Sequence, residues 1–181
     1  MRIIAGNFRG IKLDSLNGVA TRPTSDYVKE SIFNIIQNRF PCGKTLDLFA
    51  GSGALGLEAL SRGAEFAVFV DCNRAAIDVI LKNARKLNTE NFSITQRDYL
   101  KYIKSASDKF DIIFLDPPYN KGYLTLAAEA IRECEILSPG GILVIESEVN
   151  GENVDFDGFE IITIKTYGRI QISILRGSDS T

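Results

Sequence analysis

Apolar positions along this chain form two kinds of pattern, short continuous runs and helical repeats, and the alternation of these two patterns predicts the fold class. Short apolar runs indicate buried strands at residues 45–50, 66–70, 92–96, 110–115 and 142–146. Between them, apolar residues recur at the spacing of one helix face, at residues 54–62, 74–87, 99–103 and 124–137. Strands that alternate with helices predict a doubly wound, parallel α/β sheet.

The C-terminal part of the chain follows a different pattern. Residues 159–165 and 170–175 alternate apolar and polar positions, as half-buried strands do, and only residues 166–169 separate them. A connection this short cannot make the crossover that parallel strands need, so the two strands should form an antiparallel hairpin. Together with the five strands before it, the pair predicts a mostly parallel seven-stranded sheet with an antiparallel C-terminal strand.

The N-terminal part should form a small β-hairpin at residues 2–14, followed by an amphipathic helix at 25–39. We therefore expect residues 1–24 to be a hairpin extension, and residues 177–181 to be a flexible tail. A length of 181 residues and a hydrophobic content of 45% suit one core, so a single domain should span residues 1–181.

Histidine and cysteine usage excludes several kinds of chemistry. The chain has no histidine, which rules out Ser-His-Asp and Cys-His catalysis. Its three cysteines, Cys42, Cys72 and Cys134, lie far apart, so we expect no metal site and a reducing compartment. No apolar segment approaches the roughly 18 residues of a membrane span, and no signal-peptide pattern is visible, so we expect a cytoplasmic protein.

The net charge of −2 is unevenly distributed. Residues 1–44 carry seven basic and three acidic side chains, whereas the rest of the chain carries 14 basic and 20 acidic ones. A basic N-terminal part on an otherwise acidic protein can bind phosphate groups at that part of the surface. An ordinary solvated N-terminal segment, however, could carry the same charges. Charge alone leaves both interpretations open.

A glycine-rich loop, Gly51 to Gly56, follows the first buried strand and opens a helix, as in nucleotide-binding sites. Asp71 closes the next strand 20 positions after Gly51, where a carboxylate that binds ribose is expected. This pattern suits NAD as well as S-adenosylmethionine. Asp47 favours the latter, because it is placed to address a positively charged amino group and no hydride-transfer site is evident. Asp98 should accept a hydrogen bond from an adenine amino group, cap the following helix, or do both.

Asp116-Pro117-Pro118-Tyr119 follows the apolar run 110–115 and should lie at the carboxyl end of a buried strand. The prolines stiffen the backbone and lack N–H groups, so their carbonyl groups can face a substrate. The Asp carboxylate and a carbonyl can accept both hydrogens of an amino group, and the Tyr ring offers a face to a planar base. This arrangement suits a nucleobase whose exocyclic amine is the nucleophile, whereas two prolines alone would indicate only a rigid turn.

These motifs resemble those of class I S-adenosylmethionine-dependent methyltransferases, which have a Rossmann-like fold. The chain is most similar to one group, the bacterial small-subunit ribosomal RNA methyltransferase D family. The similarity covers nearly the whole chain and is carried by Thr21 to Asn34 (TRPTSDYVKESIFN), Asp47 to Gly53 (DLFAGSG), Asp116 to Tyr119 (DPPY) and Tyr167-Gly168. The resemblance implies methylation of N2 of one guanine in 16S rRNA.

The motifs and the resemblance together give a set of expected site residues. The catalytic group would be Asp116, Pro117, Pro118 and Tyr119. S-adenosylmethionine would contact Asp47, Gly51, Ser52, Gly53, Gly56, Asp71, Cys72, Asp98 and Tyr99. Candidates for contacts to RNA are Arg2, Arg9, Arg22, Thr24, Lys29 and Tyr167. The resemblance implies the small ribosomal subunit or its assembly intermediate as the substrate, and we expect a monomer.

Two other functions remain open at this point. Asp-Pro-Pro-Tyr also occurs in adenine-N6 methyltransferases of DNA or RNA, although 181 residues leave no evident target-recognition domain. A noncatalytic RNA-binding assembly factor could keep the same fold, although an intact Asp-Pro-Pro-Tyr motif argues against lost activity.

Overall fold

The structure, a computed structural model, describes residues 1–16 (the N-terminal segment), 26–119, 121–151, 154 and 156–177. These residues form a seven-stranded sheet with the strand order β3-β2-β1-β4-β5-β7-β6. The strands are β1 (Cys42–Asp47), β2 (Ala64–Asp71), β3 (Phe92–Gln96), β4 (Phe110–Leu115), β5 (Leu137–Glu148), β6 (Phe159–Tyr167) and β7 (Ile170–Gly177). β7 pairs antiparallel with β5 and β6, and the other neighbours are parallel, which confirms the predicted fold class.

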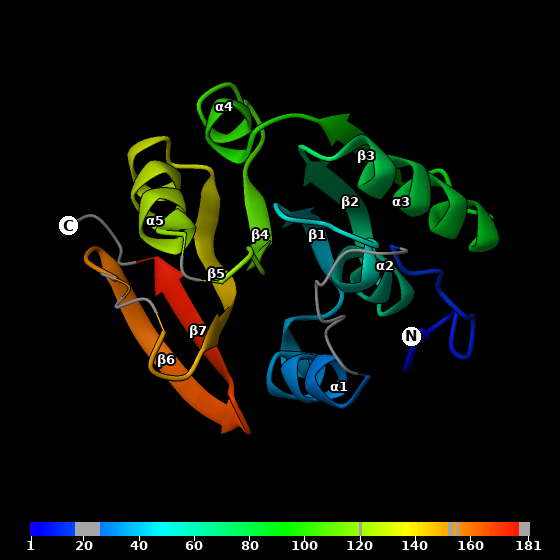
Figure 1. Cartoon of the computed structure of the whole chain (residues 1–181), viewed down its shortest axis with the longest axis horizontal. Helices are drawn as coiled ribbons and strands as arrows, with labels where there is room; N and C mark the ends of the chain where they lie inside the picture. Colours follow the sequence, from blue (N-terminus) through cyan, green and yellow to red (C-terminus); the bar gives the residue numbers. More distant parts are fainter. Residues whose placement is uncertain (17–25, 120, 152–153, 155, 178–181) are drawn as a thin grey trace.

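Helices cover both faces of this sheet (Figure 1). On one face, apolar side chains of α4 (Tyr99–Ile103) and α5 (Tyr123–Glu133) join a core cluster with β1, β2, β4 and β5. The other face is packed against α1 (Asp26–Ile35), α2 (Ala54–Ser61) and α3 (Arg74–Lys86). A short 3-10 turn, Gln37–Arg39, follows α1. None of the helices in the described part of the chain has both the length and the apolar character that crossing a membrane requires.

The N-terminal segment folds back on itself as the expected hairpin does, but its pairing is too short to count as two strands. Its arms meet in one antiparallel bridge, between Arg2 and Lys12, and in backbone hydrogen bonds such as those from Ile3 N–H to the Ile11 carbonyl (2.9 Å) and from Leu13 N–H to the Met1 carbonyl (3.0 Å). Its apolar residues Ile3 and Leu13 are buried in a cluster with α2 and α3. Backbone pairing between its two arms and packing onto these helices together hold the segment in place. Residues 17–24 of the expected extension and residues 178–181 of the expected tail lie outside the described residues.

Element boundaries near α5 also differ from the prediction. The helix ends at Glu133, before residue 137, and Glu135 has a left-handed backbone conformation with φ 51° that helices do not continue through. β5 begins already at Leu137, although the Pro-Gly-Gly that follows indicates a turn. The reason is pairing with β4, which reaches back to Phe110 opposite Leu137 across a register shift.

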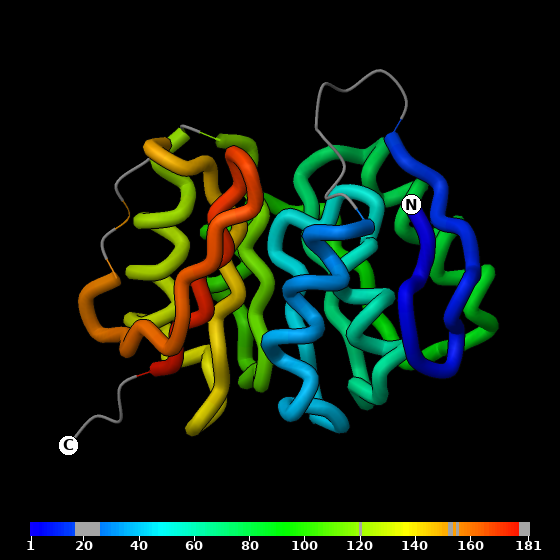
Figure 2. The backbone as a smooth tube through the Cα atoms, turned by 90° about the horizontal axis from the view of Figure 1, so that it is seen from below, coloured from blue at the N-terminus to red at the C-terminus, as the bar shows by residue number. Residues whose placement is uncertain are grey.

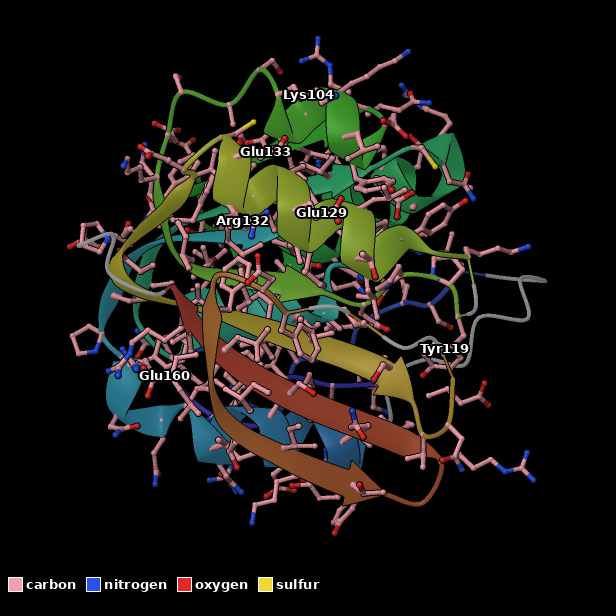
Figure 3. All side chains as sticks on the ribbon, turned by 90° about the vertical axis from the view of Figure 1, so that its left-hand side faces the viewer. Lys104, Tyr119, Glu129, Arg132, Glu133 and Glu160 are labelled. Carbon is pink, nitrogen blue, oxygen red and sulfur yellow. The ribbon has the colours of Figure 1, made fainter. Side chains whose placement is uncertain are left out.

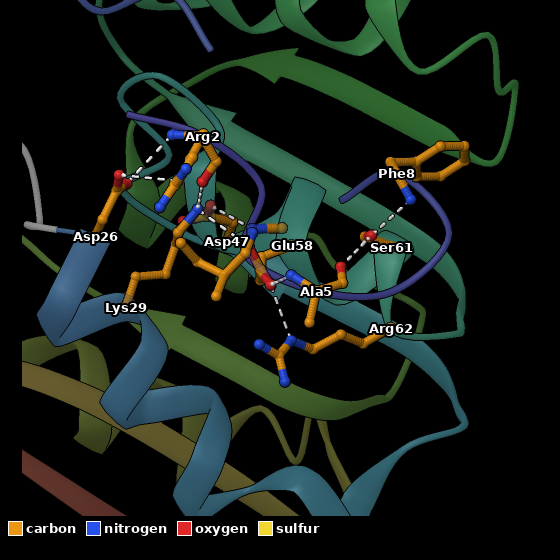
Figure 4. A network of polar contacts seen from close by, with 11 residues as sticks. Arg2, Ala5, Phe8, Asp26, Lys29, Asp47, Glu58, Ser61 and Arg62 are labelled. Atoms are coloured by element: carbon orange, nitrogen blue, oxygen red, sulfur yellow. Dashed lines mark hydrogen bonds and ion pairs between the residues drawn. The ribbon is translucent and has the colours of Figure 1, made fainter. Parts of the chain in front are cut away.

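Buried polar contacts fix the N-terminal segment to α2 (Figure 4). Glu58 of α2 is fully buried and accepts hydrogen bonds from the backbone N–H groups of Ile4 (2.8 Å) and Ala5 (3.0 Å). Its charge is balanced by Lys29 Nζ at 3.1 Å and Arg62 Nε at 2.9 Å. A buried carboxylate needs such partners to offset its lost hydration. Figure 2 shows the segment running along the outside of α2 and α3.

Candidate active site

The parallel strands bring the predicted site residues to one edge of the sheet. β1, β2, β3 and β4 run in the same direction, so their carboxyl ends and the loops that follow lie side by side. Open α/β sheets bind their ligands at this edge. The strand ends and loops there carry Asp47, Gly51, Ser52, Gly53, Asp71, Cys72, Asp98 and Asp116 to Tyr119.

Asp71, the last residue of β2, ties the glycine loop to its neighbouring strand. One carboxylate oxygen accepts from the backbone N–H of Gly51 (2.9 Å), and the other accepts from the N–H of Asn73 (2.8 Å). A carboxylate oxygen can accept more than one hydrogen bond, so the half-buried Asp71 retains capacity for ribose hydroxyl groups. Cys72 beside it is exposed, and its carbonyl accepts from Gln96.

The glycines of this loop have two different structural roles. Gly51 and Gly53 have positive φ angles of 54° and 78°, which glycine adopts without strain. At Gly56, in the first turn of α2, an added Cβ would lie 2.3 Å from Cε1 of Phe69, so glycine lets α2 pack closely on β2. Its N–H donates to Asp47. Gly56 therefore has a packing role, and its expected contact with the cofactor stays a prediction.

Asp47, the last residue of β1, is a buried carboxyl group beside the start of α2. Only 2% of its surface is exposed, and its Oδ2 accepts from the N–H of Gly56 at 3.1 Å. Burial raises the pKa of Asp47 to about 7, and the nearby charge of Asp71 acts in the same direction. A positively charged group bound beside Asp47 would favour its ionised form.

Asp98 is the N-cap of α4, where its carboxylate accepts from the backbone N–H of Lys101 at 3.1 Å. The capping role is confirmed, and a hydrogen bond to adenine stays a prediction. Tyr99, next along, is buried, with its ring centroid 4.9 Å from that of Phe49 and 5.5 Å from that of Tyr123. This aromatic cluster was not predicted from the sequence, although Phe49 stands within the glycine-loop motif.

The loop from Asp116 to Tyr119 follows β4, and a carboxylate from the next strand fixes its tyrosine. The Tyr119 hydroxyl donates to Oε1 of Glu146 on β5 at 3.0 Å. Glu146 is buried and stands immediately beyond the last residue of β5 that pairs with β4. Burial raises the pKa of Tyr119, and the charges of Glu146 and Asp116 raise it further, so the hydroxyl keeps its proton. Figure 3 shows Tyr119 beside the carboxyl end of β5.

Exposure differs among the residues of this loop. Pro117 is buried and Pro118 is exposed, whereas Asp116 and Tyr119 are half-buried. The buried proline anchors the loop in the protein, and the two half-buried side chains remain accessible to a substrate. Glu146 was missed by the sequence analysis. Its position could have been noticed in the sequence, because it is the one charged residue of the otherwise apolar run 142–146 and stands at the end of that run.

The residues expected to contact RNA do not all lie on the surface. Arg2 and Arg9 are exposed on the N-terminal segment, and Tyr167 is half-buried at the end of β6. Arg22 and Thr24 lie outside the described residues.

Lys29 was expected to contact RNA, and the structure shows that this prediction is wrong. It is fully buried, donates to the carbonyl of Arg2 and forms an ion pair with Glu58. Burial lowers the pKa of Lys29, and the charge of Glu58 opposes that effect. Its ammonium group therefore balances Glu58 inside the protein and does not reach a phosphate.

A buried amide joins the N-terminal segment to the glycine loop. Asn83 on α3 is fully buried, and its Nδ2 donates to the carbonyls of Asp14 (3.0 Å) and Ser52 (2.9 Å). Its Oδ1 accepts from the N–H of Asp14 at 2.8 Å. Through Asn83, the carbonyl of Ser52 is tied to α3.

Within the described residues, no group of three or more His, Cys, Asp or Glu side chains could hold a metal ion. The carboxylates at the strand ends bind backbone N–H groups instead, those of Gly51, Gly56, Asn73 and Lys101.

Comparison with known proteins shows close relatives over most of the chain. The family model described as Conserved hypothetical protein 95 matches residues 1–176. The candidate rRNA methyltransferase YlbH of Bacillus subtilis is 40% identical, and the match covers 97% of this chain and 98% of that protein. The ribosomal RNA small subunit methyltransferase D of Haemophilus influenzae is 34% identical, and the match covers 93% of this chain and 89% of that protein.

A solved structure has the same fold. The candidate methyltransferase YhhF of Escherichia coli matches with a TM-score of 0.89 at 32% identity, over 98% of both chains. The strand order and the placement of the helices are those of a class I S-adenosylmethionine-dependent methyltransferase fold. On sequence and structure alike, the chain belongs to the Conserved hypothetical protein 95 family, which contains the small-subunit ribosomal RNA methyltransferases D.

Proposed function

We propose that this chain transfers a methyl group from S-adenosylmethionine to the exocyclic N2 amine of a guanine in 16S rRNA. The observation that carries the proposal is the placement of Asp116 to Tyr119 on the same sheet edge as the contact between Asp71 and Gly51. A base-binding loop and a ribose-binding acid are thus separated only by β1. The names of its relatives support rRNA of the small subunit as the substrate class.

The strand ends of β1, β2 and β3 carry the residues that would hold the cofactor. Asp71 would accept from the ribose hydroxyl groups, and Asp47 would balance the positively charged amino group. Asp98 and Tyr99 would border the adenine. These residues suit S-adenosylmethionine. The Asp71 carboxylate can accept further hydrogen bonds, and the glycine loop beside it has little side-chain bulk. When bound, S-adenosylmethionine supplies a methyl group on a sulfonium, which an amine can displace.

The end of β4 carries the residues that would prepare the amine. The lone pair of guanine N2 is delocalised into the ring, which makes the amine a weak nucleophile. Hydrogen bonds from its two hydrogens to the Asp116 carboxylate and the Pro117 carbonyl would orient the lone pair and make it more available. Once nitrogen carries the methyl group its proton leaves easily, so a chain without histidine needs no strong base.

Tyr119 would stack on the guanine ring, and its hydrogen bond to Glu146 holds it in position for that contact. A guanine that is paired and stacked in a helix cannot present its amine to this loop. The substrate guanine is therefore unpaired or flipped out when it reacts.

The direct test is mass spectrometry of nucleosides after incubation of the protein with S-adenosylmethionine and small ribosomal subunits that lack the modification. N2-methylguanosine is the expected product. N6-methyladenosine would instead identify an adenine methyltransferase. Binding of the subunits without any methylation would identify a noncatalytic assembly factor.

Asp116 gives the sharpest prediction for this mechanism. Asp116→Ala should lower kcat by about 10-fold to 100-fold or more, because a hydrogen bond to a charged group is lost where the amine reacts. The affinity for S-adenosylmethionine, measured by calorimetry, should change by no more than a few-fold. Asp78→Ala, at an exposed acid of α3, is the matched control. Turnover near that of the wild type in Asp116→Ala would remove Asp116 from the mechanism.

A further inference from the structure

Tyr27 is the most exposed of the large apolar and aromatic side chains in the described residues, with 65% of its surface accessible. It stands in the first turn of α1. Its ring meets Tyr167 edge to face, with centroids 5.8 Å apart and ring planes at 84°. Edge-to-face pairs of this kind are favourable, so Tyr167 helps to hold an exposed ring in a defined place.

The sheet register places this pair at the same end of the sheet as the loop of Asp116 to Tyr119. Tyr167 of β6 pairs with Ile170 of β7, which pairs with Glu148 of β5. Two residues earlier on β5 is Glu146, the partner of the Tyr119 hydroxyl. Because adjacent strands are about 4.8 Å apart, β6 lies roughly 10 Å from β5. In Figure 3, Tyr119 and the turn between β6 and β7 lie at the same end of the sheet.

Exposed basic residues belong to the segments that adjoin Tyr27 and Tyr167. The neighbouring Asp26 accepts from the backbone N–H of Arg2 (3.2 Å) and lies 3.8 Å from its Nε. The Arg2 side chain remains 66% exposed. Arg169 is exposed in the turn that follows Tyr167. An exposed ring with basic residues on the neighbouring segments offers a stacking surface together with groups that attract phosphates.

We propose that Tyr27, backed by Tyr167, forms a stacking subsite for an unpaired nucleobase of the RNA substrate, next to the guanine that reacts at Asp116. The proposal rests on the proposed function. A guanine that leaves its stack exposes the faces of its neighbours in the RNA, and an aromatic ring at the surface can cover one of these faces. Every base has such a face, so this subsite would add affinity without reading sequence.

The test compares Tyr27→Ala with Tyr27→Phe, and uses Leu126→Ala, at an exposed apolar residue of α5, as the control. The measurements are kcat and KM with small ribosomal subunits that lack the modification, and affinity for S-adenosylmethionine alone. Loss of one base stack should raise KM for the subunit by about 5-fold to 100-fold in Tyr27→Ala. Tyr27→Phe and Leu126→Ala should stay near the wild type, and cofactor affinity should not change in any variant.

The dependence of subunit binding on salt separates stacking from charge. Stacking releases no counterions, so Tyr27→Ala should weaken binding at every salt concentration and leave the slope of log affinity against log salt unchanged. A wild-type KM in Tyr27→Ala would overturn the proposal, and so would an equal loss in Tyr27→Phe, because the hydroxyl would then be the contact.

Failure of the proposed function would look different from failure of the subsite. If the wild-type protein methylates no RNA, the proposed function fails. Direct binding of the same small subunits, measured by filter retention, then still decides the subsite. Weaker binding by Tyr27→Ala than by Leu126→Ala supports it, and equal binding overturns it.

Discussion

At the residue scale, the buried carboxyl group of Asp47 makes the glycine-loop region sensitive to pH. Its pKa of about 7 in the folded protein lies above the ordinary value of 3.8, mainly because burial disfavours the charged form. Between these two values the folded protein retains a proton that the unfolded chain has released. The contribution of Asp47 to stability therefore falls as pH rises from about 4 to about 7.

Asp47→Asn should remove this part of the pH dependence. Without bound cofactor, the wild type should lose on the order of 2 kcal/mol more stability than the variant between pH 5 and pH 7.5. Urea unfolding at both values measures the difference. The chain has no histidine, so few other groups titrate in this window. An equal pH dependence in wild type and Asp47→Asn would show that Asp47 is ionised throughout.

At the scale of elements, Asn83 links α3 to two loops that are distant in sequence. It binds Asp14 of the N-terminal segment and Ser52 of the glycine loop through one amide group. The N-terminal segment is thus part of the support of the cofactor loop. Two of its other polar anchors, Glu58 and Ser61 of α2, hold the segment without contacting Ser52.

This difference gives a matched pair of variants. Asn83→Ala and Ser61→Ala each remove a buried side chain that binds the N-terminal segment, so both should destabilise the protein by about 1–3 kcal/mol. Only Asn83→Ala frees the Ser52 carbonyl, so only this variant should weaken S-adenosylmethionine binding, by several-fold in calorimetry. Equal affinities in two folded variants would restrict Asn83 to a purely structural role.

The arrangement of the strands and helices decides which site residues the sequence could predict. The strand ends at Asp71 and Asp116 could be predicted, because parallel strands share one edge of a sheet and both residues close apolar runs. The residues that were misjudged depend on partners elsewhere in the chain. In the sequence Lys29 resembles a surface cation, and only the structure shows Glu58 beside it. Glu146 becomes part of the site through its hydrogen bond with Tyr119, which lies 27 positions away in the sequence. Local pattern carries no information on such pairs.

At the scale of the whole molecule, charge is divided between a basic N-terminal part and an acidic remainder. Residues 1–44 carry seven basic and three acidic side chains, against 14 and 20 in the rest. The structure changes which of the basic groups can act on a substrate. Lys29 is buried, whereas Arg2 and Arg9 are exposed on a segment that buried contacts hold against α2. A fixed segment with exposed cations is suited to phosphate contacts.

Arg2→Ala/Arg9→Ala should therefore weaken binding of small ribosomal subunits and reduce its dependence on salt. Each phosphate contact to single-stranded RNA contributes about 0.7 to the slope of log affinity against log salt, so the double variant should lose roughly 1.4. Lys104→Ala/Lys109→Ala, which removes two exposed cations of the acidic part, should leave the slope unchanged. Melting temperatures of both double variants show whether the arginines instead stabilise the N-terminal segment. If Arg2→Ala/Arg9→Ala melts early and keeps the wild-type slope, the segment is a structural brace and phosphates are bound elsewhere.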